Sequence, residues 1–190
     1  VPGPACRPDW NDDGLLTHYL TIDLISAITP GFFAFWDAGI PKPPMPGTGR
    51  SLQKILLVKT SSLGDVIHNL PVVSDLKANF PELQIDWVVE ESFAAIPKLH
   101  PGVSEVIPVA LRRWRKRLLS PATWREIAAV RRQLQATPYD AVLDTQGLLK
   151  SALITRQARG LHLGHNADSA REPLAARFYD AAFFVPKTLH

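Results

Sequence analysis

The stretch of sequence that decides the fold is KILLVKTSSLGD, at residues 54–65. Its first five residues are nearly all apolar, as is typical of a strand buried on both faces of a parallel sheet. The small, polar residues 59–65 predict a tight turn, and apolar residues then recur at helical spacing over 66–80, with Pro71 kinking or restarting the helix. The segment therefore predicts a strand, a turn and a helix, the repeating unit of an α/β fold.

The same alternation continues along the chain. Apolar runs predict further strands, and helical patterns predict further helices: strands at 85–89, 103–109 and 141–143, and helices at 92–99, from the pair Ser120-Pro121 onward, at 148–159 and at 170–182. In the helix that follows Ser120, Trp124 and Leu134 share one face with Ile127 and Val130. Strands that alternate with helices imply right-handed βαβ units, so we expect a Rossmann-like, doubly wound parallel sheet covered on both faces.

The composition places the chain among globular proteins. Of its 190 residues, 46% are hydrophobic and 21% are charged, which excludes wholesale disorder and collagen-like or coiled-coil architectures. A proline-rich segment at 41–49 separates two unlike parts. We expect residues 1–50 to be an irregular, proline-rich extension and linker whose native origin stays open, and residues 51–190 to be one Rossmann-like domain.

Charge is distributed unevenly between these two parts. Residues 1–50 carry three basic and five acidic side chains, whereas residues 51–190 carry eighteen and thirteen. The basic second part points to an anionic partner. A single cysteine, Cys6, excludes an internal disulfide, and the most apolar early stretch, 15–36, is interrupted by Asp23. We therefore expect no spanning helix, no secretory signal and a cytoplasmic location.

The turn at 59–65 is the first place where the sequence concentrates chemistry. In parallel sheets, ligands bind beyond the carboxyl ends of the strands, and this turn directly follows one. Gly64 lets a ligand approach the backbone closely. Asp65 has two interpretations: a carboxylate that caps the following helix, which the pattern alone favours, or a general base at the mouth of the sheet. The turn matches neither the dinucleotide-binding nor the P-loop fingerprint, so dehydrogenases and P-loop kinases lose their main support.

A strongly basic segment, RRWRKR at 112–117, follows the third predicted strand. Five of its six residues are cations, and guanidinium groups pair well with phosphates and carboxylates. The alternatives are a solvated basic surface with Trp114 turned inward, or a nucleic-acid patch that uses the same cations. The tight clustering at a strand end favours a compact polyanionic ligand.

Two further positions follow later strands. The Gln146 amide and the Gly147 N–H lie where they could hold a polar ligand, and an ordinary strand-to-helix turn is equally compatible with them. Arg171 could reach the same pocket or pair with Glu172 or Asp168, and the sequence does not decide. The six histidines show no metal-ligand spacing, so we expect no metal site.

Five segments of the chain, in order, resemble the amino-terminal part of the ADP-heptose:lipopolysaccharide heptosyltransferases of glycosyltransferase family 9. They are 54–71, 86–91, 112–116, 144–152 and 170–175, and the resemblance covers about 54–190. It implies the amino-terminal, acceptor-binding half of a GT-B glycosyltransferase, with the carboxyl-terminal donor domain absent from this chain. It also implies inverting transfer of L-glycero-D-manno-heptose from ADP-heptose to the Kdo of Kdo2-lipid A in lipopolysaccharide core synthesis.

The resemblance assigns roles to the residues singled out above. Asp65 would be the general base that takes the proton from the acceptor hydroxyl, and Gly64 would contact the donor. The acceptor would be held by Thr60, Ser61, Ser62, Arg112, Arg113, Arg115, Lys116, Gln146, Gly147 and Arg171. No cofactor is implied, because ADP-heptose is itself a substrate. The central expectation is that the Asp65 carboxylate and the basic segment 112–117 converge on one sugar of the acceptor.

These roles carry further expectations. Backbone N–H groups at the start of the following helix would lower the pKa of Asp65. A lowered pKa is compatible with the role of general base when the proton transfer follows departure of the leaving group. We expect this chain alone to bind the acceptor with little or no transfer, as a peripheral protein on the inner face of the inner membrane. Ala167 stands where family members often carry Trp. The alternatives are a sibling heptosyltransferase with another core acceptor, and a basic α/β module that binds nucleic acid.

Overall fold

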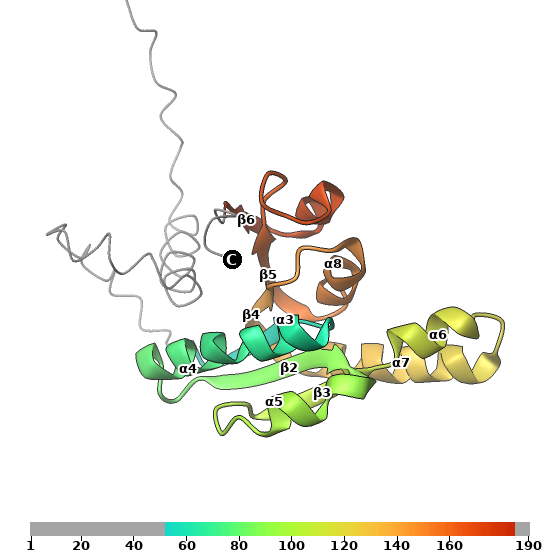
Figure 1. Ribbon diagram of the computed structural model, residues 1–190, viewed down its shortest axis with the longest axis horizontal. Coiled ribbons are helices and arrows are strands. Elements are labelled where there is room, and N and C mark those ends of the chain that lie inside the picture. The colour runs from blue at the N-terminus through green and yellow to red at the C-terminus, as the bar shows by residue number, and fades with distance from the viewer. Residues whose placement is uncertain (1–51, 185–190) are drawn as a thin grey trace, which may run out of the picture. The chain divides into compact units, whose positions relative to one another are not determined.

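The structure is a computed structural model that describes residues 52–184, so the whole extension expected at 1–50 and the end of the chain at 185–190 lie outside it. Its centre is a six-stranded sheet with the order β3-β2-β1-β4-β5-β6, in which all neighbouring strands are parallel (Figure 1). The strands are β1 (Lys54–Val58), β2 (Gln84–Glu90), β3 (Glu105–Val109), β4 (Pro138–Asp144), β5 (Arg159–His165) and β6 (Ala181–Phe183). This sheet confirms the predicted α/β fold, and its parallel strands bring their carboxyl ends to one edge.

Helices connect the strands. They are α3 (Leu63–His68), α4 (Leu70–Asn79), α5 (Ala95–Lys98), α6 (Leu111–Lys116), α7 (Pro121–Ala136) and α8 (Leu149–Thr155), with 3-10 helices η1 (Glu91–Phe93) and η2 (Pro173–Phe178). Pro71 lies in the first turn of α4 and Pro121 begins α7, where a missing N–H costs no helical hydrogen bond. None of the helices within residues 52–184 has the length and apolar run needed to cross a membrane.

Two segments late in the chain differ from the prediction. The predicted helix at 148–159 ends at Thr155, and the strand β5 that follows was not predicted. The predicted helix at 170–182 is wrong, because this segment holds a 3-10 helix and the short strand β6. The local sequence is rich in helix-forming alanine, but pairing of β5 with β4 and of β6 with β5 decides the structure.

The first turn of α7 also departs from its sequence pattern. Trp124 shares a face with Leu134 in the sequence, yet its side chain is 57% exposed whereas Leu134 is 1% exposed. The Trp124 ring instead turns toward the α6–α7 connection, where its Nε1–H donates to the Leu118 carbonyl oxygen at 2.7 Å. In the first turn of α7 the buried side chain is therefore Thr123, and Trp124 lies outside the buried face.

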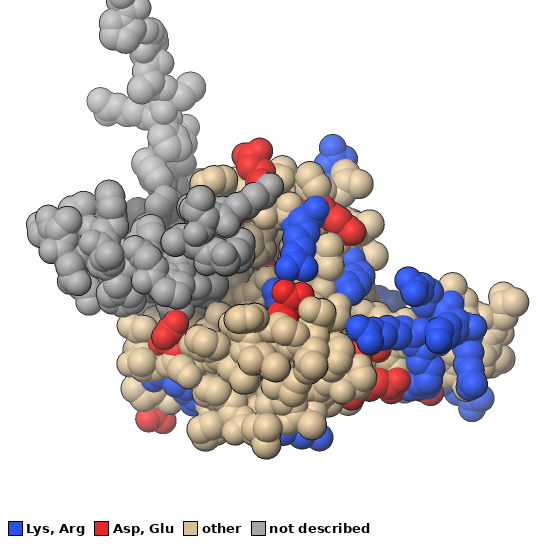
Figure 2. All heavy atoms as spheres, viewed as in Figure 1, with Lys and Arg blue, Asp and Glu red and all other residues tan. Residues whose placement is uncertain are grey.

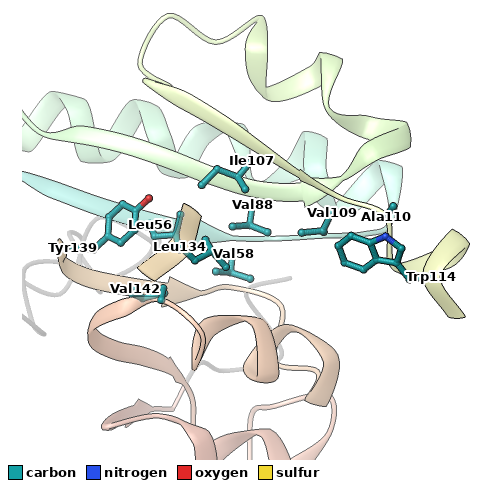
Figure 3. Close-up of a cluster of buried hydrophobic side chains, with 11 residues drawn as sticks. Leu56, Val58, Val88, Ile107, Val109, Ala110, Trp114, Leu134, Tyr139 and Val142 are labelled. Atoms are coloured by element: carbon teal, nitrogen blue, oxygen red, sulfur yellow. The ribbon is translucent and has the colours of Figure 1, made fainter. Parts of the chain in front are cut away.

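A hydrophobic cluster joins the sheet to α6 and α7 (Figure 3). Leu56 and Val58 of β1 pack in it with Leu134 of α7 and with Trp114 of α6. Trp114 is 8% exposed, and its Nε1–H donates to a Glu126 carboxylate oxygen at 2.8 Å. This inward tryptophan was one of the interpretations of the basic segment, and it anchors α6 against the end of the sheet.

One buried polar group ties together the three central strands of the sheet. Asp86 of β2 is fully buried. Its Oδ2 accepts a hydrogen bond from the Tyr139 hydroxyl at 2.9 Å and forms an ion pair with Lys54 Nζ, also at 2.9 Å. Burial and the negative charge of Asp86 raise the pKa of Tyr139. A buried carboxylate is stable only when its partners remain, so this triad fixes β1, β2 and β4 to one another.

We expect Tyr139→Phe to lower the free energy of unfolding by about 1–3 kcal/mol, because Asp86 stays desolvated while a hydrogen bond to it is lost. Urea unfolding followed by circular dichroism measures the change. Gln157→Ala, which removes an exposed side-chain hydrogen bond to the Leu153 carbonyl oxygen of α8, is the control and should have a much smaller effect. Equal unfolding midpoints for Tyr139→Phe and the unaltered chain would show that the triad contributes nothing.

Candidate functional site

The Asp65 carboxylate lies in the first turn of α3, beyond the carboxyl end of β1. Its Oδ2 accepts hydrogen bonds from the Ser62 backbone N–H at 2.8 Å and from the Ser62 hydroxyl at 3.1 Å. Its Oδ1 pairs with Arg171 Nη2 at 3.1 Å. The carboxylate thus caps the helix and also meets a cation, so the capping interpretation of Asp65 does not exclude the general base.

Arg171 is the residue that the structure brings directly to Asp65. It comes from the segment between β5 and η2, and a second guanidinium nitrogen lies 3.4 Å from Asp65 Oδ2. Its side chain is 58% exposed, against 22% for Asp65. The sequence left open a pairing of Arg171 with Glu172, but Glu172 instead accepts the Leu149 backbone N–H at 2.6 Å, at the start of α8. Arg171 is therefore available to the site.

The pKa of Asp65 is lowered by its surroundings. Burial is the largest influence and would raise the pKa, but the Ser62 N–H and the charges of Lys59 and Arg171 together outweigh it. The folded domain therefore holds this carboxyl group ionised at neutral pH. The stability that this ionised group contributes is present above its ordinary pKa and is lost as the pH falls through the lowered one.

Two lysines lie in or contact the turn that leads to this carboxylate, and with Arg171 they form a basic rim. Lys59, at the end of β1, is 9% exposed, and its Nζ donates to the Thr145 carbonyl oxygen at 2.9 Å. Burial lowers the pKa of Lys59, while the negative charge of Asp65 acts against this shift. Lys150 of α8 donates from Nζ to the Ser61 hydroxyl oxygen at 2.7 Å. Neither lysine was predicted as a site residue, although Lys59 directly follows a predicted strand and Lys150 lies in the first turn of a predicted helix.

Thr60 and Gln146 join the turns that follow β1 and β4. The Thr60 N–H and hydroxyl both donate to Gln146 Oε1, at 2.9 and 2.8 Å, and Gln146 Nε2 donates to the Ser61 hydroxyl oxygen at 3.3 Å. Both residues are buried. The direct contacts of Thr60 and Gln146 are thus with each other, and they fix the position of Ser61; a role in binding the acceptor stays a prediction.

Asp144 holds the backbone of the turn that follows β4. Its Oδ1 accepts the N–H groups of Gln146 and Gly147, at 2.8 and 3.2 Å, and its Oδ2 accepts the Tyr179 hydroxyl at 2.8 Å. Burial raises the pKa of Asp144, in spite of these hydrogen bonds. Gly147 adopts a φ of 65°, where a side chain would be strained. These contacts favour the plain strand-to-helix turn for this segment.

Gly64 leaves the surface of the first turn of α3 open. A Cβ atom built at this position would meet no other atom within 4 Å, so packing does not require a glycine there. Its φ is not positive, because the positive-φ glycines of the described part are Gly147 and Gly160. The open backbone beside Asp65 is available for close approach of a ligand.

The basic helix α6 carries one arginine that is paired with carboxylates and several further cations that are exposed. Arg113 donates to Glu91 at 3.1 and 3.0 Å and forms a second ion pair with Glu126 at 2.9 Å. The pKa of Arg113 is raised by hydrogen bonds to Glu91 and to Glu126. Arg113 therefore fastens α6 to η1 and α7. Within residues 52–184, no salt bridge joins the other cations of this helix to a carboxylate, namely Arg112, Arg115 and Lys116.

A chain of contacts connects α6 to the turn after β1. The Glu90 N–H at the end of β2 donates to the Thr60 carbonyl oxygen at 3.1 Å, and a Glu90 carboxylate oxygen accepts the Arg112 N–H at 3.2 Å. The Arg112 guanidinium lies over the Phe93 ring, 5.1 Å from its centre. Asp65 and the basic helix therefore follow β1 and β3, which flank β2, at the same edge of the sheet; their convergence on one sugar stays a prediction.

Within the described residues, no group of three or more His, Cys, Asp and Glu side chains is placed to hold a metal ion. What the site offers instead is an ionised carboxylate in a basic rim. Such an arrangement can accept a proton from a hydroxyl and can hold carboxylate or phosphate groups beside it.

Replacing Arg171 with alanine should raise the pKa of Asp65 toward its ordinary value, because a neighbouring positive charge is lost. The carboxyl 13C shift of Asp65, followed against pH by NMR, measures this directly. Arg115→Ala removes an equal charge from α6 and serves as the control, with a much smaller expected shift. The same titration curve for Arg171→Ala and the unaltered chain would mean that the ion pair does not form in solution.

Comparison with known proteins agrees with this fold. Residues 127–190 match the model of glycosyltransferase family 9 (heptosyltransferase). The chain is 51% identical to lipopolysaccharide heptosyltransferase 1 of Escherichia coli K12 over 138 residues, which are 72% of this chain and 43% of the relative. It is 54% identical to lipopolysaccharide heptosyltransferase 1 of Pseudomonas aeruginosa over 136 residues, 70% of this chain and 38% of the relative.

A solved structure of E. coli heptosyltransferase WaaC with ADP-2-deoxy-2-fluoro heptose superposes with a TM-score of 0.70 at 50% identity. The match covers 72% of this chain and 44% of that structure. The chain thus spans less than half the length of these relatives. Sequence, fold and family model agree, and the chain belongs to glycosyltransferase family 9, the heptosyltransferases.

Proposed function

We propose that this domain is the acceptor-binding half of an inverting heptosyltransferase, which moves L-glycero-D-manno-heptose from ADP-heptose to the Kdo of Kdo2-lipid A. ADP-heptose serves as a substrate, and no separate cofactor takes part. The names of the relatives and the nucleotide sugar in the E. coli structure support this choice. The observation that carries it is the ionised Asp65 carboxylate, set between Lys59 and Arg171 at the ligand-binding edge of the sheet.

Asp65 takes the proton of the attacking acceptor hydroxyl in this proposal. The hydroxyl oxygen forms a bond to the anomeric carbon of heptose, the bond from that carbon to the diphosphate breaks, and ADP leaves from the opposite face. The proton passes to Asp65. Because the pKa of Asp65 is lowered, the transfer comes late, when the hydroxyl has become acidic through bond formation.

Arg171 changes partner when the acceptor binds. In the free domain it occupies Asp65 Oδ1, the oxygen that a hydroxyl needs. Its side chain is more than half exposed, so the guanidinium can move to a Kdo carboxylate without losing a buried contact. The acceptor thus brings the anion that releases Asp65.

The exposed cations of α6 bind the remaining anionic groups of the acceptor, its second carboxylate and its lipid phosphates. Arg112, Arg115 and Lys116 serve this role, while Arg113 positions the helix through Glu91 and Glu126. A lipid acceptor requires the enzyme to work at a membrane surface, and we place it in the cytoplasm, peripheral to the inner membrane.

Transfer is tested in a chimera, because the relatives contain a further part that this chain does not span. Residues 54–184 replace the equivalent part of the E. coli relative, and heptose transfer from ADP-heptose to Kdo2-lipid A is measured. Asp65→Asn should lower kcat by about a hundredfold or more, since general-base catalysis contributes about that much. Acceptor binding should be nearly unchanged. If the chimera with Asp65→Asn retains its kcat, Asp65 is not the general base.

Acceptor binding is tested on the chain itself, with Kdo2-lipid A in detergent micelles. Arg115→Ala combined with Lys116→Ala should weaken binding by about tenfold or more, because two charge-assisted contacts are lost. Arg131→Ala combined with Arg132→Ala removes the same charge from the exposed side of α7 and should change little. Equal losses of affinity in both double variants would show that binding depends on net charge alone and not on the position of these cations. Tighter binding of an already heptosylated core would assign a sibling acceptor, and retention on DNA in place of lipid would favour a nucleic-acid module.

A further inference from the structure

Apolar side chains gather at the connection between α6 and α7, which we name the α6–α7 tip (residues 115–125). Leu119 is 100% exposed, Trp124 is 57% exposed and Leu118 is 52% exposed. Single exposed leucines are common on protein surfaces, but adjacent ones beside an exposed tryptophan are not. Neither the fold nor the proposed transfer explains why the apolar surfaces of these three side chains are exposed.

The tip holds its apolar residues outward in a defined conformation. The Trp124 Nε1–H donates to the Leu118 carbonyl oxygen at 2.7 Å, so the indole braces the backbone that carries both leucines. The Ser120 N–H donates to the Arg117 carbonyl oxygen at 3.0 Å, closing the turn. The exposed leucines therefore stand on an ordered turn that begins α7, and their exposure is part of the fold.

Cations surround this apolar tip. Residues 111–125 contain six arginines and lysines and no aspartate or glutamate. Arg113 is the one member of this stretch that is joined to carboxylates by salt bridges within the described part of the chain. Figure 2 shows Lys and Arg side chains gathered over α6 and the adjoining part of α7. The unneutralised positive charge lies directly beside the exposed leucines.

We propose that the α6–α7 tip docks on the surface of an anionic phospholipid bilayer. Leu118, Leu119 and Trp124 enter the boundary between headgroups and acyl chains, as amphipathic protein segments do. Arg117 and Arg125, with the neighbouring cations of α6, lie at the level of the lipid phosphates. Leu118, Leu119, Trp124, Arg117 and Arg125 lie outside the proposed acceptor site, whereas Arg115 and Lys116 are shared with it. Only the biological purpose of this surface, presenting a lipid-linked acceptor, rests on the proposed function.

The chemistry of the tip favours a bilayer over other polyanions. A nucleic acid would satisfy the cations but would leave the leucines in contact with water and phosphate. A bilayer satisfies both, because its anionic headgroups and its apolar interior lie a few ångströms apart. The buried Trp114 and the Arg113 ion pairs join α6 to the domain, so docking of the tip holds the ligand-binding edge near the lipid surface.

Flotation of the full 190-residue chain with phosphatidylcholine vesicles that contain phosphatidylglycerol, and no Kdo lipid, tests the proposal. Leu118→Ser combined with Leu119→Ser should weaken vesicle binding by about tenfold or more, because two apolar insertions are lost at unchanged charge. Leu99→Ser is the matched control, since Leu99 is 83% exposed at the end of α5, and it should bind as well as the unaltered chain. The single variant Leu119→Ser checks that weaker binding does not come from misfolding, because this position is fully exposed.

Brominated lipids report insertion separately from adsorption. They should quench part of the tryptophan fluorescence of the unaltered chain, and Trp124→Phe should remove that part. Vesicle binding that is identical in the double serine variant, or a Trp124 signal that brominated lipids leave unchanged, would overturn the proposal. Binding of DNA with no vesicle binding at the same salt concentration would overturn it as well. Because the vesicles carry no acceptor, failure here is distinct from loss of transfer on Asp65→Asn.

Discussion

The ion pair between Asp65 and Arg171 joins residues that are 106 positions apart in the sequence. It forms because β1 and β5 are parallel and flank β4, so the segments that follow them meet at the same edge of the sheet. The pair combines with the Ser62 cap and with Lys59 to keep the carboxyl group ionised, in spite of partial burial that acts in the opposite direction. The proposed chemistry depends on this balance, because only an ionised Asp65 can receive a proton.

The surroundings of the site show how the fold maintains this balance. Thr60 and Gln146 hold the turns after β1 and β4 together, and Asp144 holds the backbone of the second turn. These residues are buried and rigidly bonded, whereas Arg171 and the cations of α6 are exposed. The site thus consists of a fixed carboxylate and movable cations, an arrangement suited to an anionic ligand that exchanges one partner for another.

Much of the fold could be predicted from local sequence. The apolar run of β1, the polar turn after it and the prolines in the first turns of α4 and α7 each carry their own signal. β5 could not be predicted, since its Gly160, Gly164 and histidines obscure the apolar alternation and its pairing with β4 is non-local. For the same reason the sequence left the partner of Arg171 open and gave no sign that Glu91 and Glu126 neutralise Arg113. The predicted extension at 1–50 and the boundary after it remain predictions, outside the described residues.

The central claim is that the acceptor hydroxyl replaces Arg171 at the Asp65 carboxylate. A crystal structure of this domain with a soluble Kdo-containing fragment tests it most directly. We predict a hydroxyl oxygen of the sugar about 3 Å from Asp65 Oδ1, with the Arg171 guanidinium moved onto a carboxylate of the ligand. A bound fragment with the Asp65–Arg171 ion pair intact, and no sugar hydroxyl near Asp65, would contradict the account.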